Sequence, residues 1–329
     1  MNMNISRTAM VRLNPALVGK TWGGAKLGTP NEDGPIGESW ICSERPEGRS
    51  IVSTGAAAGM NFDQYLNEIG PKGMGTNTAK MDRFPLLVKI IDTGQPVSIQ
   101  VHPDDAHAQA LGQPYGKEEM WVIINADPHS VAYCGVSRRL TSDEFSQAIS
   151  SNTVINVLNK VYPKTGDVFN ISAGMIHGAE AGVTFCEIQQ NSNTTYRVYD
   201  YDRTDANGNR RKLHIEQAKE VADLNPHESY SAIGEAEKIA GGTRQLLGQG
   251  KCFRTIRYIV QPDSTVNIPL TKSSFANIVI LSGDATLTLR DQVEPVTSIQ
   301  SWFVPAQDEK LTVIAAATGC TFLAVTVPE

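Results

Sequence analysis

Four polar side chains from three separate segments could together bind a metal ion. Gln100 and His102 lie two residues apart in the strand-like run VSIQVH, and the side-chain period of two in a strand places both on one face. The next strand-like run begins with KEEMW, so Glu118 or Glu119 could lie opposite His102 if the two strands are antiparallel neighbours. His177 follows a glycine-containing turn in SAGMIHGAE. Two imidazoles, one carboxylate and one amide oxygen would form a zinc-type site with positions left for water or substrate.

Each of these residues also has an ordinary explanation. A glutamine two residues before a histidine is weak evidence for a ligand pair, and glutamates at the start of a strand are often a solvated cap. The metal hypothesis therefore depends on the convergence of all three segments. The remaining histidines fall in turns or near short helices, where a surface or capping role is favoured: His107, His129, His214 and His227.

Three cations stand in unusual surroundings. Arg197 lies among three tyrosines in TTYRVYDYDR, where it could pack on aromatic rings or stabilise an anionic substrate. Lys89 interrupts the apolar run FPLLVKIID. An unpaired buried ammonium is costly, so Lys89 must reach an edge or meet an anion. Lys117, beside the two glutamates, has the same alternatives.

Strand-like runs dominate the chain and must position these side chains. Runs rich in Val, Ile, Thr and aromatic residues alternate with Gly, Pro, Asp and Asn, which predicts a mostly β fold. In the C-terminal third they recur about every 8–12 residues, as in a sandwich or small barrel. Helices are predicted at 62–69, 104–112, 214–224 and 140–161, the last starting at a Thr141–Glu144 capping box.

A polar, glycine-containing segment at 234–250 suggests a domain boundary. We expect residues 1–240 to form a larger catalytic, metal-binding domain with helical insertions. Residues 241–329 would form a smaller all-β domain, with no strong internal repeat in the sequence.

Composition limits the function classes. With 40% hydrophobic and 19% charged residues the chain is globular, and its net charge of −6 argues against broad attraction to nucleic acid. The five cysteines are scattered, which predicts reduced thiols and a cytoplasmic protein. Arg12 and Asn14 interrupt any apolar N-terminal segment, so a signal peptide is not expected. The run at 311–327 contains Thr-Gly, so we expect two core strands around a turn there and no membrane span.

The ordered set FPLLVKIID, SIQVHPDD, GKEEMW, ISAGMIHG and QQNSNTTYRVYDYDR, preceded by WGG at residues 22–24 and IGESW at 36–40, resembles type I phosphomannose isomerase in its short bacterial form. The resemblance runs from about residue 22 to residue 213. It implies a zinc-dependent cupin with jelly-roll β-barrel domains that interconverts mannose 6-phosphate and fructose 6-phosphate. It also implies a small-molecule partner, no nucleic acid or membrane, and a monomer or weak homodimer.

Site roles follow from the same resemblance. One zinc ion per chain would be bound by Gln100, His102, Glu119 and His177, with Glu119 preferred because it directly precedes the MW pair. The family's active-site arginine falls on Arg197. Its substrate-binding lysine, serine and second lysine fall on Lys89, Ser98 and Lys117, which we expect to form the phosphate neighbourhood.

The sequence departs from the family pattern in three places. The turn before His177 reads SAGMIH and lacks the usual proline and threonine, Val122 replaces a frequent tyrosine, and the C-terminal domain has lost a Gly-Asp pair. That domain carries no metal motif.

The implied reaction removes a proton beside a carbonyl and passes through an enediolate, whose negative oxygen must be stabilised. The general base stays open, with Glu38, Glu44 and Asp105 as weak candidates. Two other readings remain: a different metal-dependent cupin enzyme, such as an iron oxygenase, and a non-catalytic sugar-phosphate sensor.

Overall fold

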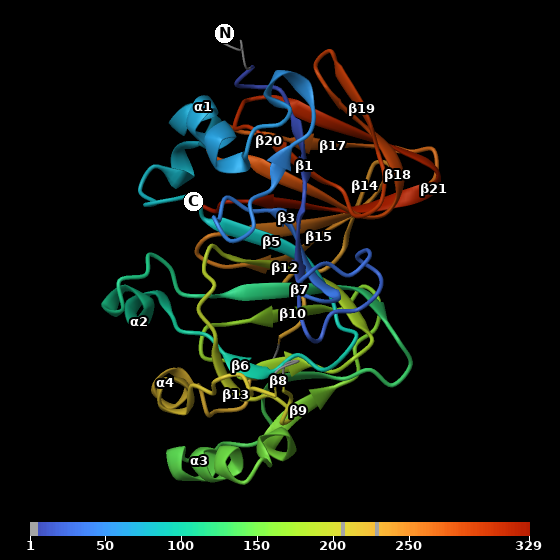
Figure 1. Cartoon of the computed structure of the whole chain (residues 1–329). Coiled ribbons are helices and arrows are strands. Elements are labelled where there is room, and N and C mark those ends of the chain that lie inside the picture. Colours follow the sequence, from blue (N-terminus) through green and yellow to red (C-terminus); the bar gives the residue numbers. More distant parts are fainter. Residues whose placement is uncertain (1–5, 205–207, 228–229) are drawn as a thin grey trace. The chain divides into compact units, whose positions relative to one another are not determined.

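A computed structural model describes residues 6–204, 208–227 and 230–329 (Figure 1). Antiparallel strands predominate and helices are few, as the sequence predicts, so the mostly β, cupin-like class is confirmed. Two compact units divide the chain. The first takes in residues up to Ala16, Trp40–Val88 and Ala232–Glu329, and the second takes in Leu17–Ser39 and Lys89–Ser231. The boundary at residue 240 stays a prediction.

The second unit contains every predicted metal-binding, catalytic and substrate-binding residue. Its smaller sheet has the order β13-β6-β11-β8-β9, with the bounds Tyr196–Tyr199, Ile99–Val101, His177–Ala179, Ala132–Val136 and Leu158–Val161. A second sheet has the order β10-β7-β12-β5-β3-β2, with the bounds Val168–Ile171, Glu119–Ala126, Val183–Gln190, Leu86–Asp92, Ile36–Cys42 and Ala16–Gly19. Its first three strands lie wholly in this unit, and the other three lie in it only in part.

A hydrophobic core joins the facing parts of these two sheets. Trp121 and Phe185 of the second sheet pack in one cluster with Ala132 and Ala179 of the smaller sheet. On its other face the smaller sheet buries Ile99 and Val101 against helices α3 (Ser142–Ser150) and α4 (Ile215–Val221). Alternate residues of β6 therefore point into two different environments, which leaves Gln100 and His102 facing the other sheet.

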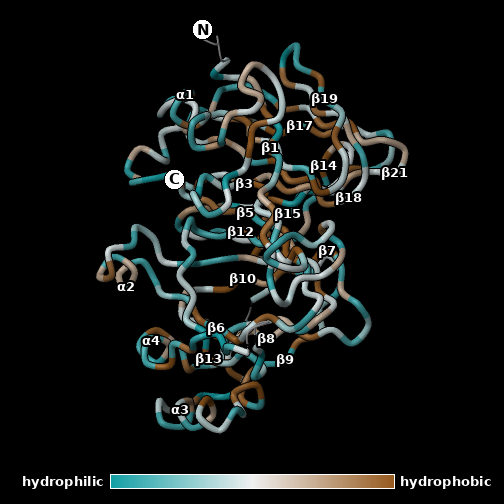
Figure 2. The backbone as a smooth tube through the Cα atoms, viewed as in Figure 1, coloured by the Kyte–Doolittle hydropathy of each residue, from teal (hydrophilic) through white to brown (hydrophobic). Residues whose placement is uncertain are grey.

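The first unit is built around a ten-stranded sheet. Its main order is β14-β15-β16-β21-β18-β20-β1-β4, with β17 paired to β21 and β19 paired to β18. Figure 2 shows hydrophobic residues along the strands around β17 and β18. In the same order the bounds are Glu237–Ile239, Gly242–Gln249, Arg254–Val260, Lys310–Thr326, Ala276–Leu289, Ser301–Val304, Val11–Asn14, Ile51–Val52, Thr265–Pro269 and Gln292–Val296.

Two expectations about local structure were wrong. The segment 140–161 is not one helix: α3 ends at Ser150, a 3-10 turn follows at Val154–Val157, and β9 begins at Leu158. The capping box itself is confirmed, because Thr141 accepts from the Glu144 amide and Glu144 accepts from the Thr141 amide. The run at 311–327 is not two strands around a turn but lies almost entirely in β21, whose Gly319 bends the strand at a φ of 74°.

Helix α1 (Phe62–Met74) packs its aromatic residues on the first unit's sheet, and α2 (Asp105–Ala110) belongs to the second unit. Short 3-10 turns lie at Gly55–Ala57 and Thr76–Thr78. None of the helices within the described ranges combines the length and hydrophobicity that a membrane crossing requires.

The aromatic cluster around Phe303 should dominate the stability of the first unit. Phe303 lies 5.2 Å from Phe62 and 5.0 Å from Phe275, measured between ring centroids, and it is fully buried. Phe303→Ala should lower the free energy of unfolding by about 3–5 kcal/mol, since the ring leaves a cavity. Urea unfolding followed by fluorescence measures this. Val293→Ala, at a side chain that is 60% exposed, is the control, and equal losses in both variants would contradict the packing argument.

Candidate metal centre and cavity

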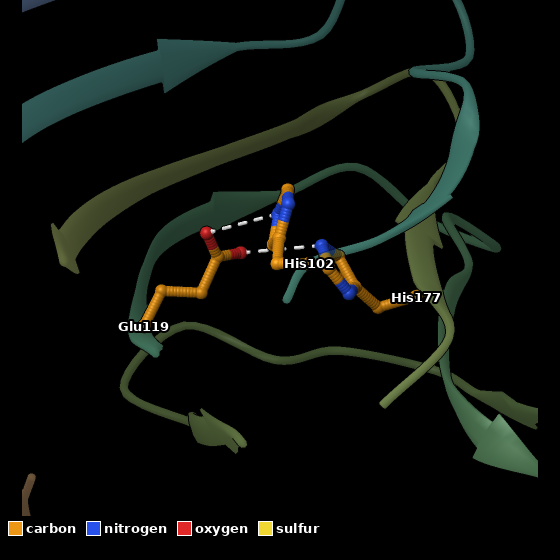
Figure 3. Close-up of side chains that lie close together, drawn as sticks. All are labelled: His102, Glu119 and His177. Atoms are coloured by element: carbon orange, nitrogen blue, oxygen red, sulfur yellow. Dashed lines mark ion pairs between the residues drawn. The ribbon is translucent and has the colours of Figure 1, made fainter. Parts of the chain in front are cut away.

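Three of the predicted ligands meet in one cluster, drawn in Figure 3. Glu119 Oε2 lies 3.4 Å from His102 Nε2, and Glu119 Oε1 lies 3.3 Å from His177 Nε2. All three side chains are buried. One ligand atom from each lies within 4.8 Å of the others, so this group could hold a metal ion.

Strand register explains why the cluster forms. His177 of β11 pairs with Gln100 of β6, and Gln100 pairs on its other side with Arg197 of β13. These three residues therefore form one row across three neighbouring strands. The sequence predicts that Glu119 lies on a strand adjacent to β6, and this is wrong. Glu119 lies on β7 in the facing sheet. The cluster thus forms between two sheets.

Gln100 is the fourth predicted ligand and reaches the edge of the cluster. Its Nε2 lies 3.4 Å from His177 Nε2, and its Oε1 lies 3.4 Å from Ser98 Oγ. A half-turn of the amide plane would point Oε1 at the cluster and let the amide nitrogen donate to Ser98. Glu118, the alternative carboxylate, is not part of the group of ligand atoms.

Backbone carbonyls fix the orientation of both imidazoles. His102 Nδ1 lies 2.9 Å from Thr194 O, and His177 Nδ1 lies 2.9 Å from Met175 O. A carbonyl can only accept, so Nδ1 carries the hydrogen in both rings and Nε2 presents its lone pair to the cluster. This is the arrangement in which outer partners usually hold metal-binding histidines. The residues present therefore fit a divalent metal.

Electrostatics keeps His102 neutral and Glu119 ionised, which are the forms that bind a metal ion. Burial, and after it the charge of Lys117, lowers the pKa of His102 to about 3, so the ring is neutral near pH 7. Burial alone would raise the pKa of Glu119, but Lys117 and then the two imidazoles hold it well below its usual range. Lys117 Nζ lies 2.6 Å from Glu119 Oε2 and 3.0 Å from His102 Nε2. The positive charge of Lys117 therefore already lies beside the carboxylate and the imidazole of this cluster.

A cavity of about 310 Å³ lies beside the cluster and is lined by Gln100 and Lys117, which contact the cluster histidines. Ser98, Lys89 and Arg197 also line it, so the structure brings all the remaining predicted site residues together. Arg197 Nε donates to Ser98 Oγ at 3.3 Å. The other lining residues are Lys20, Trp22, Glu38, Ile91, Val97, Trp121, Phe185, Glu187, Asn193, Thr195 and Arg211.

Lys89 pairs with carboxylates, which is one of the two arrangements predicted for this buried ammonium group. Its Nζ lies 3.1 Å from Glu187 Oε2 and 3.6 Å from Glu38 Oε2. Burial opposes the charge of Lys89, but Glu187 and then Glu38 outweigh burial and raise its pKa. Lys89 is therefore an ammonium group at neutral pH.

Sequence reasoning missed several cavity residues. Glu187, Arg211 and Lys20 gave no spacing signal, and Glu38 was only a weak candidate. Of the other two weak base candidates, Glu44 pairs with Arg83, and Asp105 accepts from the Gly116 amide and Gln190. Neither lines this cavity.

Trp121 should tune metal affinity without contacting the metal. Its Nε1 donates to Glu119 Oε1 at 3.0 Å, while its ring stacks on Phe185. Trp121→Phe keeps a stacked ring but removes the donor that orients the carboxylate. We expect the dissociation constant of an added divalent metal ion, measured by chelator competition, to rise about 10- to 100-fold. Trp302→Phe in the first unit is the matched control, and a similar rise there would show that the effect is not local.

Comparison with known proteins identifies the family. The model named "Phosphomannose isomerase type I, catalytic domain" matches residues 10–119. A Bacillus subtilis protein named "Probable mannose-6-phosphate isomerase GmuF" is 39% identical over 251 residues, which cover 75% of this chain and 78% of the relative. A mannose-6-phosphate isomerase from Streptococcus mutans is 37% identical over 211 residues, 62% of this chain and 65% of the relative.

Solved structures agree with this assignment. The mannose 6-phosphate isomerase from Bacillus subtilis superposes with a TM-score of 0.86 at 29% identity, over 96% of this chain and 99% of that chain. A phosphomannose isomerase from Salmonella typhimurium has a TM-score of 0.75 at 16% identity, over 98% and 100% of the two chains, and shares the fold. The chain belongs to the type I phosphomannose isomerase family.

Proposed function

We propose that the protein interconverts mannose 6-phosphate and fructose 6-phosphate with one zinc ion per chain. The observation that carries this proposal is the buried His102–Glu119–His177 group beside a cavity that contains Lys89, Lys117 and Arg197. Gln100 would be the fourth ligand. Nitrogen and oxygen donors in this number suit zinc. The bound ion would supply a Lewis acid that polarises the sugar oxygens.

The protein's own residues would perform the remaining steps. Arg197 keeps its positive charge and would share the negative charge that develops on the enediolate oxygen. Lys89, Ser98 and Lys117 would bind the sugar phosphate. Because Lys89 stays protonated, proton transfer falls to the carboxylates that line the cavity, Glu38 and Glu187.

The proposal includes a cytoplasmic location. All five cysteines are free and buried in the structure, and such thiols suit a reducing compartment.

Metal removal tests the reaction and the ligand set together. Chelation should abolish conversion of mannose 6-phosphate, and zinc should restore it, because the bound ion would polarise the sugar oxygens. His177→Asn should not recover with zinc. His107→Asn, at a histidine outside the cluster, should recover like the unchanged protein. Recovery with iron(II) and not zinc would favour an oxygenase, and binding of the sugar without any conversion would favour a sensor.

Lys89→Ala should weaken the apparent affinity for mannose 6-phosphate by at least about tenfold, since a buried charged contact is lost. The change also leaves Glu38 and Glu187 without their shared cation, so stability should fall by about 3–5 kcal/mol. Circular dichroism must therefore confirm folding at the assay temperature. Lys219→Ala on α4 is the control. Unchanged affinity in folded Lys89→Ala protein would remove Lys89 from the substrate site.

A further inference from the structure

The lysines of the cavity are already neutralised by carboxylates. Lys89 lies between Glu187 and Glu38, and Glu38 Oε1 lies 3.1 Å from Lys20 Nζ. Two ammonium groups thus face two carboxylates. Lys117 forms a 2.6 Å ion pair with Glu119. Counting side chains alone, this side of the cavity has little net positive charge for a dianion.

The arginines of the same cavity are balanced differently. Asp200 accepts from Arg211 Nε at 2.7 Å and from Arg203 Nη2 at 2.6 Å, so two guanidinium groups share one carboxylate. Within residues 6–204, 208–227 and 230–329, no ion pair joins Arg197 to a carboxylate. Its Nη1 instead donates to Lys212 O at 2.9 Å. Arg197 and Arg211 line the cavity and Arg203 shares Asp200 with Arg211, so three guanidinium groups are balanced by one carboxylate, an excess of two positive charges in this region.

This excess is held close together and partly buried. Burial, and after it the charge of Arg211, lowers the pKa of Arg197. Asp200 is only 6% exposed and fixes one edge of the Arg211 guanidinium, through Nε and Nη2. Among the residues that the structure describes, no hydrogen bond or ion pair engages Nη1 of Arg211, which remains as a donor for a ligand. Guanidinium groups fixed in this way suit the geometry of a phosphate better than flexible ammonium groups do.

We propose that the phosphate group of the substrate binds to Arg211, while Arg197 faces the reacting oxygens and Lys89 and Lys117 face the sugar carbons and hydroxyls. This inference rests on the proposed function and deepens it. It adds Arg211, which the sequence did not single out, as a residue that determines specificity for a phosphorylated sugar.

Inorganic phosphate is a direct probe of this subsite. In calorimetric titration of the zinc-loaded full-length protein, Arg211→Met should weaken phosphate binding about 10- to 100-fold, since a charge-assisted hydrogen bond to a dianion is lost. Arg138→Met removes the same charge at an exposed position paired with Glu144 and should leave the affinity within about threefold. Lys89→Ala should weaken phosphate binding less than Arg211→Met does, while it loses affinity for the sugar phosphate.

Steady-state kinetics gives the second readout. Arg211→Met should raise KM for mannose 6-phosphate about 10- to 100-fold and change kcat by less than about threefold, as expected for a contact distant from the reacting carbons. Equal phosphate affinity in Arg211→Met and the unchanged protein would overturn the inference. So would a larger loss in Lys89→Ala than in Arg211→Met, or equal losses in Arg211→Met and Arg138→Met.

The two proposals fail in different ways. If the unchanged protein converts mannose 6-phosphate and Arg211→Met matches it in phosphate affinity and KM, the phosphate assignment is wrong and the reaction stands. If phosphate binding depends on Arg211 but no sugar phosphate is converted, the anion subsite stands and the proposed reaction is wrong.

Discussion

The burial of one carboxylate constrains the whole candidate site. Glu119 is 1% exposed, and an ionised carboxylate removed from water is strongly destabilising unless cations and hydrogen bonds compensate. Lys117, Trp121 and the two imidazoles provide that compensation. Each of them is itself held by the sheets or by backbone carbonyls. The position of Glu119 and the fold around it therefore depend on each other.

Pairing of the strands converts this electrostatic need into fixed geometry. Cross-strand partners lie at constant spacing, so His177, Gln100 and Arg197 keep their order across β11, β6 and β13. A slip of one residue in β6 would turn Gln100 and His102 into the core that now holds Ile99 and Val101. The hydrophobic alternation of this short strand thus specifies where the polar ligands point.

The sequence predicted what depends on local periodicity. The shared face of Gln100 and His102, the Thr141–Glu144 capping box and the mostly β class all follow from the spacing of neighbouring residues. The approach of Glu119 from a facing sheet depends on long-range topology, which periodicity does not contain. The same holds for Lys89, whose partner Glu187 is almost a hundred residues away. The Thr-Gly pair at Gly319 predicts a turn, but glycine also permits a bend within a continuous strand, and that is what the structure contains.

Arg211 lies at the limit of such reasoning. In NGNRRKL it looks like an ordinary basic loop residue, and only its contact with Asp200 and its place in the cavity distinguish it. Phosphate does not change during the isomerisation, so contacts to it bind substrate and transition state almost equally. Such binding lowers KM and leaves kcat almost unchanged, whereas interactions made at the reacting carbons raise kcat. A neutralised lysine side and an electropositive arginine side would separate these two tasks within one cavity.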